Sequence, residues 1–101
     1  MQDNYLYTGF IRLHILYHAV QGPIFGLGII EELRRHGYDL SPGTLYPLLH
    51  RMEHDGYLSS EAQKAAGKLR RVYHVTLKGR AALDDAKLKV RELFGELFEE
   101  D

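Results

Sequence analysis

The central segment of the chain reads Ser41-Pro-Gly-Thr-Leu-Tyr-Pro-Leu-Leu-His-Arg-Met-Glu-His-Asp55. Its apolar residues recur at the spacing of one helix face, and they are Leu45, Leu48, Leu49 and Met52. At about 100° per residue, the opposite face carries Gly43, Pro47, His50 and His54, flanked by Thr44, Tyr46 and Arg51. Hydroxyls, imidazoles and a guanidinium on one face are what a helix needs to lie against phosphates and base edges.

The residues at both ends of this segment favour a helix. Ser41 is a good N-cap, and Pro42 suits the first helical position, where its missing N–H removes no bond. Gly56 is typical of a C-terminal stop. Pro47 fits less well, because a proline inside a helix removes a hydrogen bond and crowds the preceding turn. We predict a start at Ser41; the alternative is a start at Thr44, which would leave Pro47 in the first turn.

Length and composition set the broad class. With 101 residues the chain is expected to form one domain. It has no cysteine, which excludes disulfides and thiolate metal sites and fits a reducing cytoplasm. The uncharged run from Leu13 to Ile30 is interrupted too often for a membrane span, and the first residues lack the basic region of a secretory signal. We therefore expect a cytoplasmic protein that does not bind membranes.

Charge is unevenly distributed along the chain. Between Lys64 and Arg80 there are six basic residues and no acidic one, whereas residues 84–101 hold seven acidic and three basic residues. This asymmetry favours an anion-binding patch on one part of the fold. The simpler alternative is a solvated basic loop.

Two further helices are predicted before the central one. The first spans Leu6 to Val20 and is followed by Gly22-Pro23. Its predicted apolar stripe is Leu6, Phe10, Leu13, Leu16 and Val20. The second spans Phe25 to Arg35, with Phe25, Ile29, Ile30 and Leu33 facing inward. Gly26 and Gly28 weaken its first turn and could permit a close approach of another helix. Followed by a turn and the central helix, they form a helix-turn-helix.

A two-stranded hairpin is predicted directly behind the central helix. Its strands are Tyr57–Glu61 and Arg70–Thr76, joined by a turn-like tip over Ala62–Leu69. A hairpin with a basic tip in this position is a wing. The predicted fold is therefore α+β, mainly α: a winged helix-turn-helix over residues 1–78, with residues 79–101 as a C-terminal helix of the same compact unit.

Three segments resemble the PadR family of bacterial transcriptional regulators. They are Gly22-Pro-Ile-Phe-Gly26, the run from Leu40 to Leu58, and Arg70-Arg-Val-Tyr73. The resemblance implies a homodimeric winged-helix repressor of transcription that binds double-stranded DNA. Such a repressor is often released from the DNA by a small-molecule effector. One departure lies in the wing, where the family usually has Gly-Arg-Pro and this chain has Gly67-Lys68-Leu69.

The resemblance assigns DNA contacts to Tyr46, Pro47, His50, Lys68, Arg70 and Arg71. The polar helix face adds Ser41, Thr44 and Arg51 as candidates.

A long last helix is predicted from Arg80 to Glu100. Its apolar stripe has near-heptad spacing and consists of Leu83, Ala86, Val90, Leu93, Phe94, Leu97 and Phe98. A small winged core cannot cover all of it, so we expect dimerisation; the alternative is packing on the chain's own core. The predicted subunit interface comprises Tyr5, Phe10, Leu83, Val90, Leu93, Phe94 and Leu97. Two-fold symmetry would place the two DNA-recognition helices, one copy of the central helix from each subunit, roughly 34 Å apart.

The histidines allow other interpretations. His50-Arg-Met-Glu-His54 matches the H-x-x-E-H pattern of inverted zinc proteases, but no third ligand or larger scaffold accompanies it. His14 and His18 have the same spacing, and a metal-sensing role at either pair stays an alternative; we favour a helix surface or dimer seam. We predict no catalytic site, cofactor or metal. A winged-helix protein-interaction module and a drug-sensing dimer are the remaining alternatives.

Overall fold

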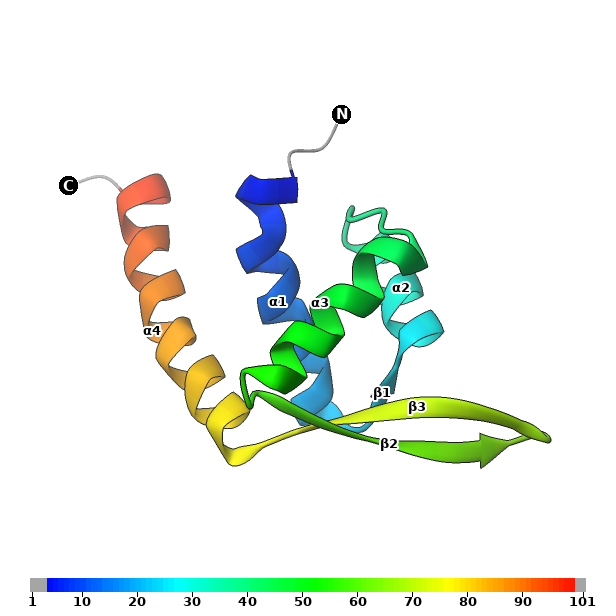
Figure 1. Cartoon of the computed structure of the whole chain (residues 1–101). Coiled ribbons are helices and arrows are strands. Elements are labelled where there is room, and N and C mark those ends of the chain that lie inside the picture. The colour runs from blue at the N-terminus through cyan, green and yellow to red at the C-terminus, as the bar shows by residue number, and fades with distance from the viewer. Residues whose placement is uncertain (1–3, 100–101) are drawn as a thin grey trace.

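The computed structural model describes residues 4–99, with side chains from residue 6 onward. Within this range the elements are α1 (Asn4–Gln21), β1 (Ile24–Phe25), α2 (Gly26–Arg35), α3 (Pro42–His54), β2 (Leu58–Ala65), β3 (Lys68–Val75) and α4 (Leu77–Phe98). Figure 1 shows the β2–β3 hairpin reaching out past the helices, and α4 standing as the outermost helix. The predicted winged helix-turn-helix with a long C-terminal helix is confirmed.

The hydrophobic core lies where α1, α2 and α3 meet the base of the sheet. Its members are Ile11, Ile15, Leu16, Ala19, Ile24, Ile29, Ile30, Leu33, Leu40, Leu45, Leu49, Met52, Leu58, Tyr73 and Leu83. Helices α2 and α3 turn their predicted faces inward. The stripe predicted for α1 is confirmed only in part. Leu13, Leu16 and Val20 lie in or against the core. Leu6 and Phe10 are exposed instead, and Ile11 and Ile15, which were not predicted, are buried. Apolar residues surround α1 on every side, so their spacing alone does not select the inward face.

Helix α3 begins where its sequence predicts. Ser41 is the N-cap in an extended conformation, Pro42 is the first helical residue, and Pro47 lies inside the helix. The Ser41 hydroxyl donates to Oγ1 of Thr44 at 3.3 Å rather than capping a backbone N–H. Pro47 has no N–H for the carbonyl of Gly43, and both residues are exposed, so that carbonyl is open to water. The start at Thr44 is excluded.

Glycines in the left-handed conformation end α2 and α3 in the same way. Gly56 has φ of 89°, and the N–H groups of Gly56 and Tyr57 donate to the carbonyls of Glu53 and Met52 at 2.9 Å. Gly37 has φ of 91° and occupies the equivalent position after α2. This arrangement is the Schellman motif, which satisfies the last free carbonyls of a helix. The backbone on either side of α3 is thereby held in a defined conformation.

The sheet is larger than the sequence pattern indicated. Its strand order is β1-β3-β2, with both pairs antiparallel, and β1 is a two-residue strand that was not predicted. The predicted loop over Ala62–Leu69 is wrong, because β2 and β3 stay paired as far as Ala65 and Lys68. The turn consists of Ala66 and Gly67, which both have positive φ, as a two-residue hairpin turn requires. The wing is consequently a long, regular ribbon.

Helix α4 begins three residues earlier than predicted. Thr76 is its N-cap, and the Thr76 hydroxyl oxygen accepts a hydrogen bond from the N–H of Gly79 at 3.0 Å. Only Gly79 and Leu83 of this helix are buried. The predicted end at Glu100 lies outside the described residues. No described helix, α4 included, has the combination of length and apolarity that crossing a bilayer requires.

Candidate nucleic-acid interface

Helix α3 presents most of its predicted polar face to solvent. The exposed residues are Ser41, Thr44, Pro47, His50 and Arg51. On the other side of the helix, Leu45, Leu49 and Met52 are buried in the core. The core therefore holds the helix, while five of its six candidate DNA-contact residues are exposed to solvent.

Tyr46 is the exception among the six. Its ring is half-buried and packs against the hydrophobic core. A Cβ atom placed on Gly26 would overlap the phenol ring of Tyr46, so the first residue of α2 must be glycine for this packing. The close approach expected at Gly26 is thus made by a side chain of α3. Tyr46 is placed to orient α3 against α2 rather than to lie on its outer face.

The wing carries its cations on two faces. The β2–β3 register is continuous, and successive residues of a strand point to opposite faces. Lys68 and Arg70 therefore share one face, whereas Arg71 lies on the other, together with the buried Tyr73. The three wing residues predicted to act together are divided in this way.

Arg70 is anchored at the base of the wing. Its guanidinium carbon lies 3.9 Å from the centroid of the Phe25 ring, which is within cation–π distance. Phe25 belongs to β1 and immediately precedes α2. Arg70 is held at a defined position, while its planar fork stays exposed and can still meet a phosphate.

Arg71 connects the wing to α3. Its Nη1 donates to Oγ of Ser60 at 3.1 Å, and the Ser60 hydroxyl lies 2.8 Å and 2.9 Å from the two carboxylate oxygens of Glu53. Glu53 is on α3 and Ser60 is on β2. This chain of polar contacts holds the Arg71 face of the ribbon beside the helix. The contact between Glu53 and Ser60 was not predicted from the sequence, since no local pattern marks such a contact.

Two carboxylates near this surface, Asp55 and Glu61, are engaged by neighbouring side chains. Hydrogen bonds from His54 and then from Arg51 hold the pKa of Asp55 below its ordinary value. Arg51 Nε donates to Asp55 Oδ2 at 3.1 Å. Hydrogen bonds from Gln63 and then His74 likewise lower the pKa of Glu61 on β2. These pairings reduce the repulsion that free carboxylates would exert on an approaching polyanion.

Four of the residues predicted for a subunit interface line a groove between α1 and α4, and they are Phe10, Leu83, Val90 and Phe94. The predicted interface residues that are exposed are Phe10, Val90, Leu93, Phe94 and Leu97. Leu83 differs, because it is buried in the chain's own core. The side chain of Tyr5 lies outside the described residues. The apolar stripe of α4 is therefore largely uncovered in the single chain.

Residues 15–85, more than half of the chain, match the transcriptional regulator PadR-like family. The chain belongs to the PadR-like family of transcriptional regulators. The resemblance on which the sequence argument relied is thereby confirmed, and its matched region contains α2, α3 and the whole wing.

Three similar proteins support the same assignment. Transcriptional regulator Rv3488 of Mycobacterium tuberculosis is 51% identical over 87 residues, covering 86% of this chain and 81% of the relative. A PadR-like transcriptional regulator from Bacillus cereus superposes with a TM-score of 0.80 at 27% identity, covering 96% of this chain and 99% of that chain. A PadR-like transcription factor from Bacteroides fragilis gives 0.81 at 29% identity, covering 94% and 96% of the two chains. These names indicate a transcriptional regulator and not an enzyme.

Proposed function

We propose that this PadR-like protein binds double-stranded DNA sequence-specifically as a homodimer. The observation that carries the proposal is the exposed polar face of α3 beside a ribbon of basic residues. In this arrangement α3 enters the major groove, where Thr44, Pro47 and His50 meet base edges. Lys68, Arg70 and Arg71 contact phosphates and set the register of the helix on the duplex.

The homodimer is supported by the uncovered apolar side of α4. Val90 is 48% exposed, Phe94 is 51% exposed and Leu97 is 62% exposed. Exposed apolar surface of this extent on one helix is typical of an interface. A second copy would cover it through the same face on both subunits, as two-fold symmetry requires. Tyr5 and Phe10 at the start of α1 are proposed to extend this contact.

A repressor released by a small effector is the specific form we favour. The groove between α1 and α4 has a volume of about 840 Å³, which suits a drug-sized molecule. Its walls include Phe10, Tyr17, Val90 and Phe94. An apolar ligand lodged there would change the relation of α1 to α4 and hence the spacing of the two α3 helices. The protein would act in the cytoplasm, where its operator lies.

The test is the selection of operator fragments by the purified protein. Fragmented DNA of the source genome is incubated with the protein, retained fragments are sequenced, and the affinity of a recovered duplex is measured at several salt concentrations. If about six phosphates are contacted, the affinity should fall about 10³-fold between roughly 50 and 200 mM salt. A shuffled duplex serves as the control for non-specific binding. No enriched sequence together with a flat salt response would exclude the proposal and favour a protein-interaction module.

A further inference from the structure

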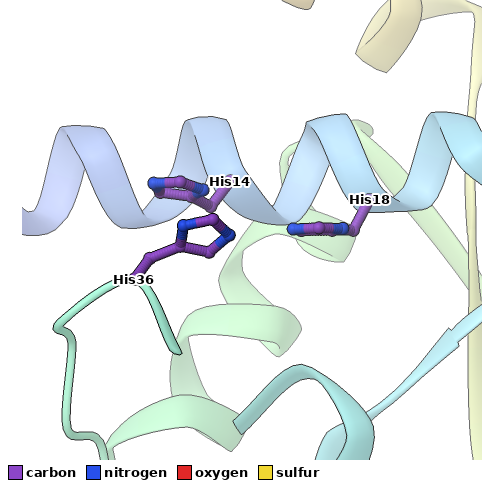
Figure 2. Close-up of side chains that lie close together, drawn as sticks. All are labelled: His14, His18 and His36. Carbon is purple, nitrogen blue, oxygen red and sulfur yellow. The ribbon is translucent and has the colours of Figure 1, made fainter. Parts of the chain in front are cut away.

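Three histidines from separate parts of the chain meet beside α1. His14 and His18 lie one turn apart on that helix, and His36 is the C-cap of α2. One ring nitrogen of each lies within 4.8 Å of the others. Figure 2 shows the three imidazoles together between α1 and the turn that carries His36. In the part of the chain that the structure describes, this is the one cluster of three or more potential metal-ligating side chains.

The rings are close enough to share an ion after a small movement. The centroids of His14 and His36 are 4.5 Å apart, and those of His18 and His36 are 6.0 Å apart. Two nitrogens bound to zinc with tetrahedral geometry are separated by about 3.4 Å, because each bond is about 2.1 Å long. His36 is exposed and can supply that movement by rotating its side chain. The Schellman motif at Gly37 meanwhile holds its backbone in place.

The hydrogen bonding of the cluster suits a ligand role. Nε2 of His18 is buried and has no hydrogen-bond partner among the described residues. An unpartnered buried nitrogen costs stability unless something binds it.

Glu32 supplies a carboxylate beside two of the three rings. Its Oε2 lies 3.4 Å from Nε2 of His36 and 3.8 Å from Nε2 of His18. Arg35 donates to its other oxygen, Oε1, at 2.6 Å and holds the carboxylate in place. A carboxylate next to ligating imidazoles orients them and offsets the charge of a bound cation.

We propose that His14, His18 and His36 bind one divalent transition-metal ion of the Zn²⁺ class. Imidazole ligands suit zinc, copper and nickel, whereas Mg²⁺ and Ca²⁺ need oxygen ligands. The same histidines line the groove between α1 and α4, which gives an ion access from solvent. The ion would tie α1 to the end of α2, just before the turn that leads to α3.

The chain contains a matched control for this site. His50 and His54 have the same spacing on α3 as His14 and His18 have on α1. No third ligating side chain joins that pair among residues 4–99. His54 instead has Nδ1 at 3.4 Å from Oδ1 of Asp55. Loss of His54 should leave binding of the ion at His36 unchanged.

The experiment titrates chelator-treated, full-length protein with ZnCl₂ by calorimetry, and with Co²⁺ while recording its visible absorption. It does not depend on DNA binding, so its outcome is separate from that of the proposed function. We expect one ion per chain for the wild type and for His54→Ala. His36→Ala should lower the affinity at least about tenfold. Zn²⁺ should raise the melting temperature of the wild type but not of His36→Ala.

Two results would overturn the site. One is equal Zn²⁺ affinity of the wild type and His36→Ala; the other is no binding by the wild type at micromolar Zn²⁺. Because His36 ends a helix, His36→Asn serves as a second variant if the alanine variant unfolds. Imidazole NMR signals of the wild type test the site without any substitution. Zn²⁺ should shift those of His14, His18 and His36, and a shift confined to His50, His54 and His74 would contradict the assignment.

Discussion

The hydroxyl of Thr76 donates to the carbonyl oxygen of Gly56 at 2.6 Å, and this contact joins α3 to α4. Oγ1 of Thr76 also accepts a hydrogen bond from the N–H of Gly79 and so caps α4. Lys78 adds a second link, because its Nζ donates to the carbonyl of Asp55 at 2.6 Å. Buried Gly79 permits the close approach, since a Cβ there would overlap the carbonyl of Tyr57. The end of α3 is thus attached directly to the start of α4, the predicted dimerisation helix.

Thr76→Val should weaken this junction. The variant loses both the helix cap and the bond to Gly56, and we expect the free energy of unfolding to fall by about 1–3 kcal/mol. Urea unfolding measures the change. Thr76→Ser keeps the hydroxyl and should remain near the wild type. Equal losses in the two variants would show that the methyl group, and not the hydroxyl, stabilises the junction.

Gly26→Ala should destabilise the protein by displacing Tyr46. The new methyl group overlaps the phenol ring, and overpacking of this kind costs about 1–3 kcal/mol. Gly9→Ala on α1 is the matched control, since nothing lies within 4 Å of its Cβ position. It should stabilise the protein by up to about 1 kcal/mol. In a Tyr46→Ala background the cost of Gly26→Ala should disappear, and a cost that persists would contradict the assigned contact.

Tyr73→Phe should be neutral or stabilising at pH 7. Tyr73 is fully buried, and its hydroxyl has no hydrogen-bond partner among the residues described. Burial, with a further contribution from Glu53, raises the pKa of Tyr73 above its ordinary value. The protonated form is therefore favoured in the folded state, so its contribution to stability is present below about pH 10 and is lost as the pH rises further. The free energy of unfolding is measured at pH 7 and above about pH 10. Its decrease between the two should be smaller for Tyr73→Phe than for Tyr17→Phe.

The sequence predicts α2 and α3 well because their signals are local. Caps, stops and helical spacing all lie within the elements themselves, as Ser41 and Gly56 illustrate. The inward face of α1 could be predicted only in part, because its apolar residues allow two stripes and only packing selects one. The strand β1 has two residues and no periodicity of its own. It exists because β3 offers a free edge to Ile24 and Phe25.

The candidate sites show the same division. The exposed face of α3 follows from helix geometry, so its residues could be named in advance. The inward placement of Tyr46 depends on Gly26, which is twenty residues away in the sequence. Only part of the histidine cluster could be predicted from the sequence. His14 and His18 share a helix, whereas His36 comes from a turn. A histidine directly before a helix-ending glycine was the available signal, but nothing local says which element it meets.

Substitutions in the wing and in α3 should have different effects on DNA binding. Lys68→Ala removes a phosphate contact, so it should weaken binding to all duplexes alike and lower the slope of affinity against salt by about one. Lys68 is a cleaner choice than Arg70, which also packs on Phe25. His50→Ala should instead change which sequence is preferred, because His50 is exposed on α3 and is proposed to contact base edges. Competition with a set of single-base operator variants distinguishes the two effects. Equal loss of specificity in Lys68→Ala and His50→Ala would show that sequence recognition is not confined to α3.

Val90→Glu should give a folded monomer with weak, non-specific DNA affinity. Burying the new carboxylate against a second subunit without a compensating cation would cost several kcal/mol. Sedimentation and operator binding on the same sample measure the result, and Leu93→Glu should behave alike. Leu88→Glu is the control, because Leu88 is 66% exposed on the opposite side of α4. A dimeric Val90→Glu protein would move the interface to the region of Tyr7 and Phe10, and an unfolded one would assign the stripe to the monomer's own core.

The length of α4 gives the molecule a mechanical lever. Its 22 residues span about 33 Å, and only the first turns are buried in the rest of the chain. A tilt of about 5° at its base would displace the far end by about 3 Å over that length. Conversely, a displacement of about 3 Å at the far end would correspond to a rotation of only about 5° at the base, where α4 is bonded to the end of α3. An imprecise contact at the far end of α4 would thus cause only a small change of orientation at its base, next to α3.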